Sequence, residues 1–185
     1  VILIMILIGA HTAAGRAPVL KNSYGIAFVS ITLGSVVTIG LLMAVGVIKP
    51  KAQYMIPLAG MTVGNAMNCA ALVMERLHSD ITGNRLAIET ALSLGKTWRQ
   101  ASAPFFRKAV KAGMMQMLNF FKVVGIVQLP GAMTGMILAG ASPLQAALIQ
   151  VIVGYMITSA VTITGLTVAY LAMHRMFTPA DQLAV

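Results

Sequence analysis

Acidic residues are almost absent from this chain. Its 185 residues include 4 Asp and Glu against 13 Lys and Arg, and charged residues make up 9% of the total. Soluble domains usually carry about a quarter charged residues. The sequence therefore excludes an ordinary soluble protein and predicts an integral membrane protein.

The excess of positive charge raises the alternative of a nucleic-acid-binding protein. Such a protein would not carry several membrane-length apolar runs, whereas 58% of this chain is hydrophobic. A helix needs about 20 apolar residues to cross a hydrocarbon core of about 30 Å. We therefore expect a lipid bilayer around the chain and no nucleic acid, and we interpret the positive charge as a topology signal.

Motifs for catalysis are also missing. The sequence has no G-x-x-x-x-G-K-[ST] phosphate-binding loop, no Glu/His pairs for a metal centre and no nucleophile with its base. His11, His78 and His174 lie at separate loop or span ends, and the single cysteine, Cys69, lies in an apolar segment that favours packing. We therefore predict a protein that is not an enzyme and holds no cofactor, and the sequence assigns no metal ligands.

The apolar runs predict an all-α, polytopic transmembrane helical bundle. We expect about four full spans, at residues 26–48, 55–77, 112–129 and 144–173. The opening VILIMILIGA is too short to span and is interpreted as the end of a truncated span, so residues 1–185 would form a single, N-terminally incomplete domain.

Prolines mark several predicted helix boundaries. Pro57 suits the first turn of its span, and Pro143 suits the first helical position after an N-cap at Ser142. Pro104 is expected to begin a short helix of its own. The last apolar run is too long for one upright span, so we expect it to tilt, protrude or break near residues 162–165.

The distribution of positive charge predicts which loops are cytoplasmic. With alternating spans, one side holds ten Lys and Arg, the other holds Lys49 and Lys51, and Lys122 lies within a span. Cytoplasmic loops carry the excess of Lys and Arg. This places residues 78–111 and the C-terminal tail inside and residues 140–142 outside.

Small residues recur at the spacing that lets helix backbones approach closely. We assign helix packing to five of them: Gly60, Gly64, Pro130, Gly131 and Gly135. Packing within one bundle is the simpler interpretation. A dimer interface or a translocation path is the alternative.

Polar side chains inside the apolar runs are candidates for a translocation path. They are Asn65, Asn68, Asn119, Lys122, Gln128 and Thr134. A charge within a span is costly and normally faces the bundle interior or a wet cavity, so Lys122 is either a gate residue or a cap on carbonyls freed by the Pro130–Gly131 break. The 14 methionines suit a soft-metal path less well than core packing.

A basic segment, residues 78–111, interrupts the apolar runs. Residues 88–100 predict an amphipathic helix with Asn84 as its cap. This helix could lie on an anionic lipid surface or dock on a cytoplasmic partner. Ala91 and Gly95 at the centre of its apolar face favour close approach by another protein.

Within this segment, ETALSLG resembles the E-A-A-x-x-x-G loop signature of ABC transporter permeases, with Thr90 in place of the first Ala. Three longer stretches, residues 57–68, 88–109 and 123–150, make the chain similar to FetB-type permeases. That family is implicated in bacterial iron export and has plant relatives involved in aluminium tolerance. The resemblance extends from about Arg16 onward.

The resemblance implies a homodimeric permease in the bacterial inner (cytoplasmic) membrane, powered by a separate ABC ATPase that holds ATP and Mg. The 78–111 segment would be its coupling loop, and the docking residues would be Glu89, Ala91, Leu92, Gly95, Trp98 and Arg99. A metal such as iron would be exported. The alternatives are a non-metal substrate, such as a sugar nucleotide, or a membrane anchor that recruits a partner and transports nothing.

Overall fold

The computed structural model describes residues 1–16, 22–48, 51–124, 131–178 and 182–183. These residues form seven helices: α1 (Ile2–Gly15), α2 (Ser23–Ala44), α3 (Ala52–Gly83), α4 (Arg85–Ser93), α5 (Trp98–Val123), α6 (Gly131–Leu138) and α7 (Pro143–Met176). The described residues contain no strand, only an isolated bridge between Phe177 and Leu183. The all-α prediction is confirmed.

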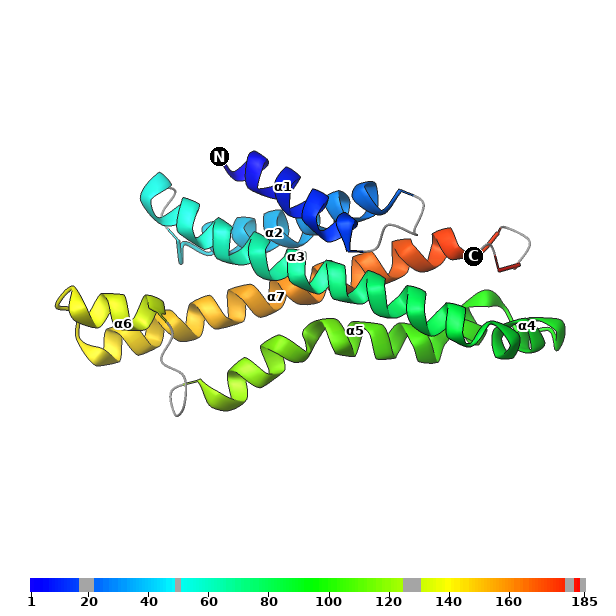
Figure 1. Ribbon diagram of the computed structural model, residues 1–185. Coiled ribbons are helices and arrows are strands. Elements are labelled where there is room, and N and C mark those ends of the chain that lie inside the picture. Colours follow the sequence, from blue (N-terminus) through cyan, green and yellow to red (C-terminus); the bar gives the residue numbers. More distant parts are fainter. Residues whose placement is uncertain (17–21, 49–50, 125–130, 179–181, 184–185) are drawn as a thin grey trace.

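Two long helices, α3 and α7, run through the centre of an elongated bundle (Figure 1). The helices α1 and α2 cover one side of this pair and α5 covers the other, while α4 and α6 lie at opposite ends (Figure 1). The core along α3 and α7 combines small residues, such as Ala66, Ala70, Ala169 and Ala172, with larger ones. Small side chains allow the helix backbones to approach closely, as in other membrane bundles.

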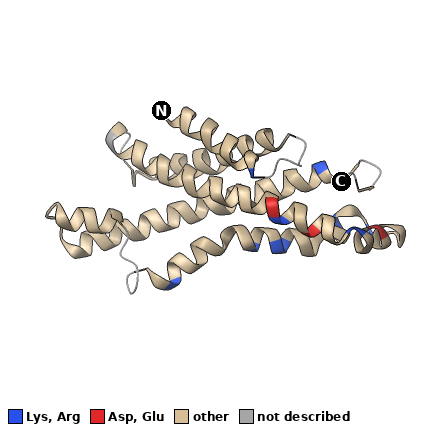
Figure 2. Ribbon diagram, in the orientation of Figure 1, with Lys and Arg blue, Asp and Glu red and all other residues tan. Residues whose placement is uncertain are grey.

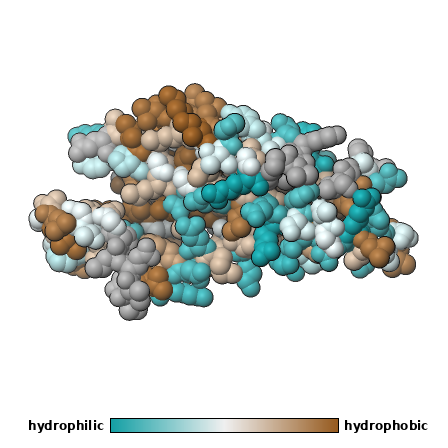
Figure 3. All heavy atoms as spheres, in the orientation of Figure 1, coloured by the Kyte–Doolittle hydropathy of each residue, from teal (hydrophilic) through white to brown (hydrophobic). Residues whose placement is uncertain are grey.

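Three helices are long and apolar enough to cross a membrane, at Ser23–Ala44, Tyr54–Gly83 and Pro143–Met176. The helix α1 is apolar but shorter. Exposed apolar side chains cover α1 and α6 in the view of Figure 3, where they can face lipid. The protein is therefore a multi-pass membrane protein, as predicted.

The predicted span at 112–129 has a different form. The helix α5 begins at Trp98, so it joins the basic segment to the apolar segment without a break and ends at Val123. The helix α6 follows at Gly131, and both α5 and α6 pack against α7. The apolar part of α5, residues 112–123, and the whole of α6 together measure about 30 Å at 1.5 Å per residue. This length is enough for one discontinuous span.

The helix boundaries follow some of the sequence signals and not others. Ser142 caps α7 and accepts a hydrogen bond from the Gln145 backbone N–H at 3.3 Å, with Pro143 at the first helical position, as predicted. The positions expected for Pro57 and Pro104 are wrong, because both lie inside longer helices, α3 and α5. The helix α7 continues unbroken through residues 162–165.

Close helix approaches occur at glycines other than those expected. A Cβ added at Gly113 would lie 2.5 Å from Cγ2 of Val73 and 2.9 Å from Sγ of Cys69. A Cβ added at Gly34 would lie 2.7 Å from the Ala160 carbonyl oxygen and would clash with the Thr164 hydroxyl. The first contact brings α5 against α3, and the second brings α2 against α7.

The expected packing glycines have more space. A Cβ at Gly60 would meet only the Met5 side chain, at 3.9 Å, and one at Gly64, Gly131 or Gly135 would meet nothing within 4 Å. Pro130 lies outside the described residues. These glycines therefore do not hold the described helices together, and their role at a dimer interface stays a prediction.

Charged residues gather toward one end of the bundle (Figure 2). We call this the basic end, and it comprises α4, the C-terminal parts of α3 and α7 and the N-terminal half of α5. Its described cations are Arg76, Arg85, Lys96, Arg99, Arg107, Lys108, Lys111 and Arg175. The turn between α6 and α7 lies at the opposite end (Figure 1).

Cysteine labelling can test which end of the bundle faces the cytoplasm. We expect a cysteine at position 141, next to Ser142, to react with a membrane-impermeant maleimide from outside, and one at position 93, in α4, to react only after permeabilisation. The unsubstituted chain is the control, since Cys69 is 3% exposed and should not react. The reverse pattern would overturn the assignment by charge.

Candidate functional site

A cavity with a volume of about 490 Å³ lies where α5 ends and α6 begins. Four helices contribute to its wall: α3, α5, α6 and α7. Its lining residues are Met61, Asn65, Gln116, Met117, Asn119, Phe120, Val123, Gly131, Ala132, Gln150, Val153, Gly154 and Ile157. We call it the amide cavity, because four of these side chains are carboxamides.

The four carboxamides come from three helices: Asn65 from α3, Gln116 and Asn119 from α5, and Gln150 from α7. The Asn65 amide donates a hydrogen bond to the Met61 carbonyl at 2.8 Å, so its Oδ1 remains available as an acceptor. Gln150 is only 7% exposed, and its Oε1 has no hydrogen-bond partner among the described residues. An unsatisfied buried oxygen costs about 1–3 kcal/mol, so a bound ligand that supplied a donor would recover that energy.

The cavity lies well away from the basic end along the axis of α5. Asn119 is two turns along α5 from Lys111, the last cation of the basic end, which corresponds to about 12 Å along the helix axis. That distance is nearly half of a hydrocarbon core of about 30 Å. The amide cavity is therefore placed near the middle of the membrane.

The two helix ends at the cavity add backbone groups to its wall. The last carbonyls of α5 and the first N–H groups of α6 lack partners within their own helices, and they carry partial negative and positive charge respectively. Val123 and Gly131, at these ends, both line the cavity. Discontinuous helices in transporters place such ends at substrate and ion sites near the bilayer midplane.

The structure brings together only part of the predicted path. Asn65 and Asn119 line the amide cavity, and Asn68, Lys122 and Thr134 do not. Gln128 lies outside the described residues. Gln116 and Gln150 were missed, although an amide within the apolar run at 144–173 is the signal that could have identified Gln150.

Lys122 does not lie within one continuous helix across the membrane, because α5 ends at Val123. It is exposed and lies in the last turn of α5. A cation there interacts favourably with the partial negative charge of the helix C-terminus. The gate and capping roles of Lys122 both stay predictions.

The cavity offers amide oxygens and thioethers as ligands. Met61 and Met117 line it, whereas Met114, Met115, Met133 and Met136 do not. The described part of the chain contains no group of three or more His, Cys, Asp or Glu that could hold a metal ion. Any metal carried here would meet neutral ligands on the described walls.

A second site lies at α4, at the tip of the basic end. The predicted continuous helix at 88–100 is wrong, because α4 ends at Ser93 and α5 begins at Trp98. Gly95 lies between them with φ of +83°, a left-handed conformation that glycine adopts without strain. Thr97 then starts α5 with a capping box to Gln100.

The predicted docking face of α4 points partly inward. Ile88 is 1% exposed, and Ala91 and Leu92 pack against the core beside it. The outward side carries Leu86 and Leu94, which are 79% and 78% exposed. Two exposed leucines on a short polar helix were missed by the sequence reading, and they are well placed to contact a partner.

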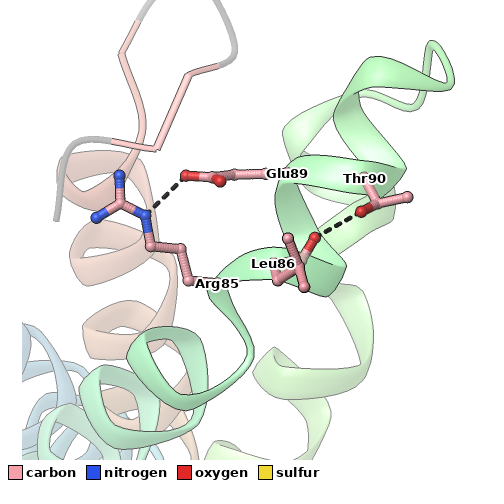
Figure 4. Close-up of polar contacts among 4 residues, drawn as sticks. All are labelled: Arg85, Leu86, Glu89 and Thr90. Atoms are coloured by element: carbon pink, nitrogen blue, oxygen red, sulfur yellow. Dashed lines mark hydrogen bonds and ion pairs between the residues drawn. The ribbon is translucent and has the colours of Figure 1, made fainter.

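The remaining predicted docking residues have distinct environments. Glu89 accepts a hydrogen bond at 2.7 Å from Nε of Arg85, and the Thr90 hydroxyl donates to the Leu86 carbonyl at 2.7 Å (Figure 4). Trp98 stacks on His174 and Phe177, with ring centroids 6.1 and 5.8 Å away. Gly95 and Arg99 are exposed.

The base of α4 is anchored to the long helices. Nζ of Lys108 in α5 lies 2.9 Å from Oδ1 of Asp80 in α3, and Asp80 is buried. Asn84 does not cap α4 as expected, because its amide donates to the Asp80 carbonyl at 2.7 Å. The ion pair therefore joins α3 to α5 close to the start of α4, and the same two helices line the amide cavity.

Comparison with known proteins identifies relatives along nearly the whole chain. Residues 1–177 match a family model described as an uncharacterised protein family, UPF0014. The UPF0014 membrane protein STAR2 of Oryza sativa subsp. japonica is 41% identical over 181 residues, which are 98% of this chain and 64% of the relative. The probable iron export permease protein FetB of Escherichia coli (strain K12) is 32% identical over 176 residues, 95% of this chain and 68% of the relative.

A second plant relative, Protein ALUMINUM SENSITIVE 3 of Arabidopsis thaliana, is 40% identical over 181 residues, 98% of this chain. The chain spans 64% and 66% of the lengths of the two plant relatives. No solved structure matches the chain.

Proposed function

The chain belongs to the UPF0014 family, and from this premise we propose that it is the permease subunit of an ABC-type transporter. One structural observation carries the proposal: a single helix, α5, begins beside the exposed docking surface of α4 and ends at the amide cavity. A helix is a stiff element, so displacement of its N-terminal end can be transmitted to the cavity. The arrangement suits a protein that couples an event at the basic end to a substrate near the bilayer midplane.

The driving partner is a separate ABC ATPase that binds ATP and Mg. It docks on α4 through Leu86 and Leu94, with Glu89, Gly95 and Arg99 exposed around them. Trp98 transmits the displacement of α4 and α5 to α7, because it joins the start of α5 to the end of α7 by ring stacking. Closure of the ATPases moves α4, α5 and α7 and so changes access to the amide cavity.

The functional unit is a homodimer in the cytoplasmic membrane. The open space beside Gly64, Gly131 and Gly135 supports an approach by a second copy there, since small residues let helices of two chains pack closely. The basic end faces the cytoplasm, in keeping with the positive-inside rule.

The first substrate to test is iron, moved outward. The name of the Escherichia coli relative supports this choice. Amide oxygens can bind a hard cation that keeps part of its water shell, and they serve equally for a chelated metal. A non-metal substrate such as a sugar nucleotide is the alternative cargo, because the cavity's carboxamides are general hydrogen-bond donors and acceptors.

A membrane anchor without transport activity is the alternative function. It would use the same α4 surface but would give no role to a cavity that contains four carboxamides, one of them buried with an unsatisfied oxygen. The amide cavity therefore favours transport.

The test is flux in proteoliposomes that contain the chain together with its ABC ATPase. With the nucleotide sites facing the bath, we expect ATP to drive Fe²⁺ into the lumen, detected by a trapped iron-sensitive fluorophore. A hydrolysis-deficient ATPase is the control. Tight ATPase association without movement of iron, chelated iron or a sugar nucleotide would contradict transport and leave the anchor.

A further inference from the structure

A second concave site lies at the basic end, between α5 and α7. It has a volume of about 220 Å³ and is lined by Trp98, Arg99, Ala103, Phe106, Arg107, Tyr170 and Met173. We call it the arginine pocket. It is separate from the amide cavity, with which it shares no lining residue.

The two arginines both line the pocket from the same helix, α5. Arg99, Ala103 and Arg107 are four residues apart, so they share one face of α5, and the arginines are separated by about 12 Å along the axis. Both arginines are exposed, and neither forms an ion pair with a described residue. Arg99 lies over the Trp98 ring, with Cζ 5.3 Å from the centroid, which fixes one side of the pocket.

The rest of the pocket is apolar and aromatic. Met173 is buried and forms part of the floor, and Phe106 is partly buried beside it. Tyr170 is half-exposed at the rim. Tyr and Trp are enriched where the bilayer meets water, with the ring in the apolar layer and the polar group at headgroup level.

We propose that the arginine pocket binds the phosphate headgroup of an anionic phospholipid from the cytoplasmic leaflet. Guanidinium groups form strong charge-assisted hydrogen bonds with phosphate, and basic pockets between transmembrane helices on this side of a membrane hold such headgroups. The apolar floor accommodates the start of the acyl chains. A soluble phosphate compound would gain nothing from that floor, which is why the pocket favours a lipid.

Trp98 provides a direct reporter, because it is the only tryptophan in the chain. The experiment places the full chain in nanodiscs of phosphatidylcholine that contain a small fraction of lipid brominated near the glycerol, which quenches nearby tryptophan. We expect brominated phosphatidylglycerol to quench Trp98 more than brominated phosphatidylcholine at the same fraction. The enrichment should be about fivefold for each arginine that contacts the headgroup.

The variants distinguish lipid binding in the arginine pocket from a general attraction of anionic lipid to the positive charge of the basic end. Arg99→Gln with Arg107→Gln should abolish the preference for the anionic lipid. Arg107→Gln alone should reduce it about fivefold without touching the Trp98 ring. Arg76→Gln with Lys111→Gln is the matched control, because it removes two exposed cations of the basic end that do not line the pocket, and it should leave the preference unchanged.

Three results would overturn the proposal. One is equal quenching of Trp98 by both lipids in the unsubstituted chain. Another is an equal loss of the preference for the anionic lipid in the Arg99/Arg107 variant and in the Arg76/Lys111 control variant. The third is displacement of the brominated lipid by millimolar inorganic phosphate, which would assign the pocket to a soluble anion. None of these measurements requires an ATPase or transport, so the outcome is independent of the function proposed above.

Discussion

Replacing Leu86 and Leu94 together with serine is expected to release the ATPase from this protein. Both side chains are almost fully exposed on α4 when the chain is alone. Burying a leucine at an interface is worth about 1.5–3 kcal/mol, so losing two should weaken association on the order of 100-fold or more. Coupled ATP hydrolysis and transport should fall with it.

The measurement is co-purification and binding affinity of the ATPase, with insertion and thermal stability followed in parallel. Stability should not change, because exposed positions contribute little to folding. Leu138→Ser with Leu144→Ser is the matched control, since it removes two exposed leucines at the opposite end. An unchanged affinity in the Leu86 and Leu94 variant would place the docking surface elsewhere than α4.

These leucine substitutions test docking more cleanly than changes at Gly95 or Glu89. Gly95→Trp should also block docking, but any side chain at φ of +83° strains the backbone. Glu89→Lys should weaken docking, but it also breaks the ion pair with Arg85. In both cases a local change of α4 accompanies the change of surface.

Replacing Gln150 with leucine should also reduce transport while stability is retained, but here the ATPase should stay bound. The Gln150 Oε1 is buried without a described partner, so an apolar side chain of similar size removes an unsatisfied group. Stability should stay the same or rise by about 1 kcal/mol. Transport should fall at least about tenfold if the amide contacts substrate, which corresponds to a lost interaction of about 1.4 kcal/mol.

The controls for Gln150→Leu come from the same region. Gln145→Leu makes the same chemical change on α7, in its first turn and outside the amide cavity. Lys122→Met removes an exposed charge from the end of α5 and should cost about 0.3–1 kcal/mol of stability with little effect on transport. Normal transport in Gln150→Leu, or an equal loss in Gln145→Leu, would remove the amide cavity from the path.

The sequence alone determined the class of the protein and its main divisions. Few acids and long apolar runs are sufficient to predict a helical membrane protein, because the bilayer admits each apolar segment largely on its own composition. Local signals were less consistent: the Ser142–Pro143 start of α7 was predicted correctly, whereas Pro57 and Pro104 lie inside longer helices. The resemblance to FetB-type permeases also followed from stretches of sequence and is confirmed by the family match.

Only the tertiary structure decided which side chains meet. The helical wheel grouped Ala91 and Leu92 as an outer docking face, but they turn inward because Ile88 beside them is buried in the core. Gly60 and Gly64 have the spacing of a packing motif, yet the close approaches are at Gly34 and Gly113, since contact depends on the facing helix as much as on the glycine. Gln150 joins Asn65 and Asn119 in one cavity only because α3, α5 and α7 bring residues far apart in the chain to the same depth, and no local pattern encodes that meeting.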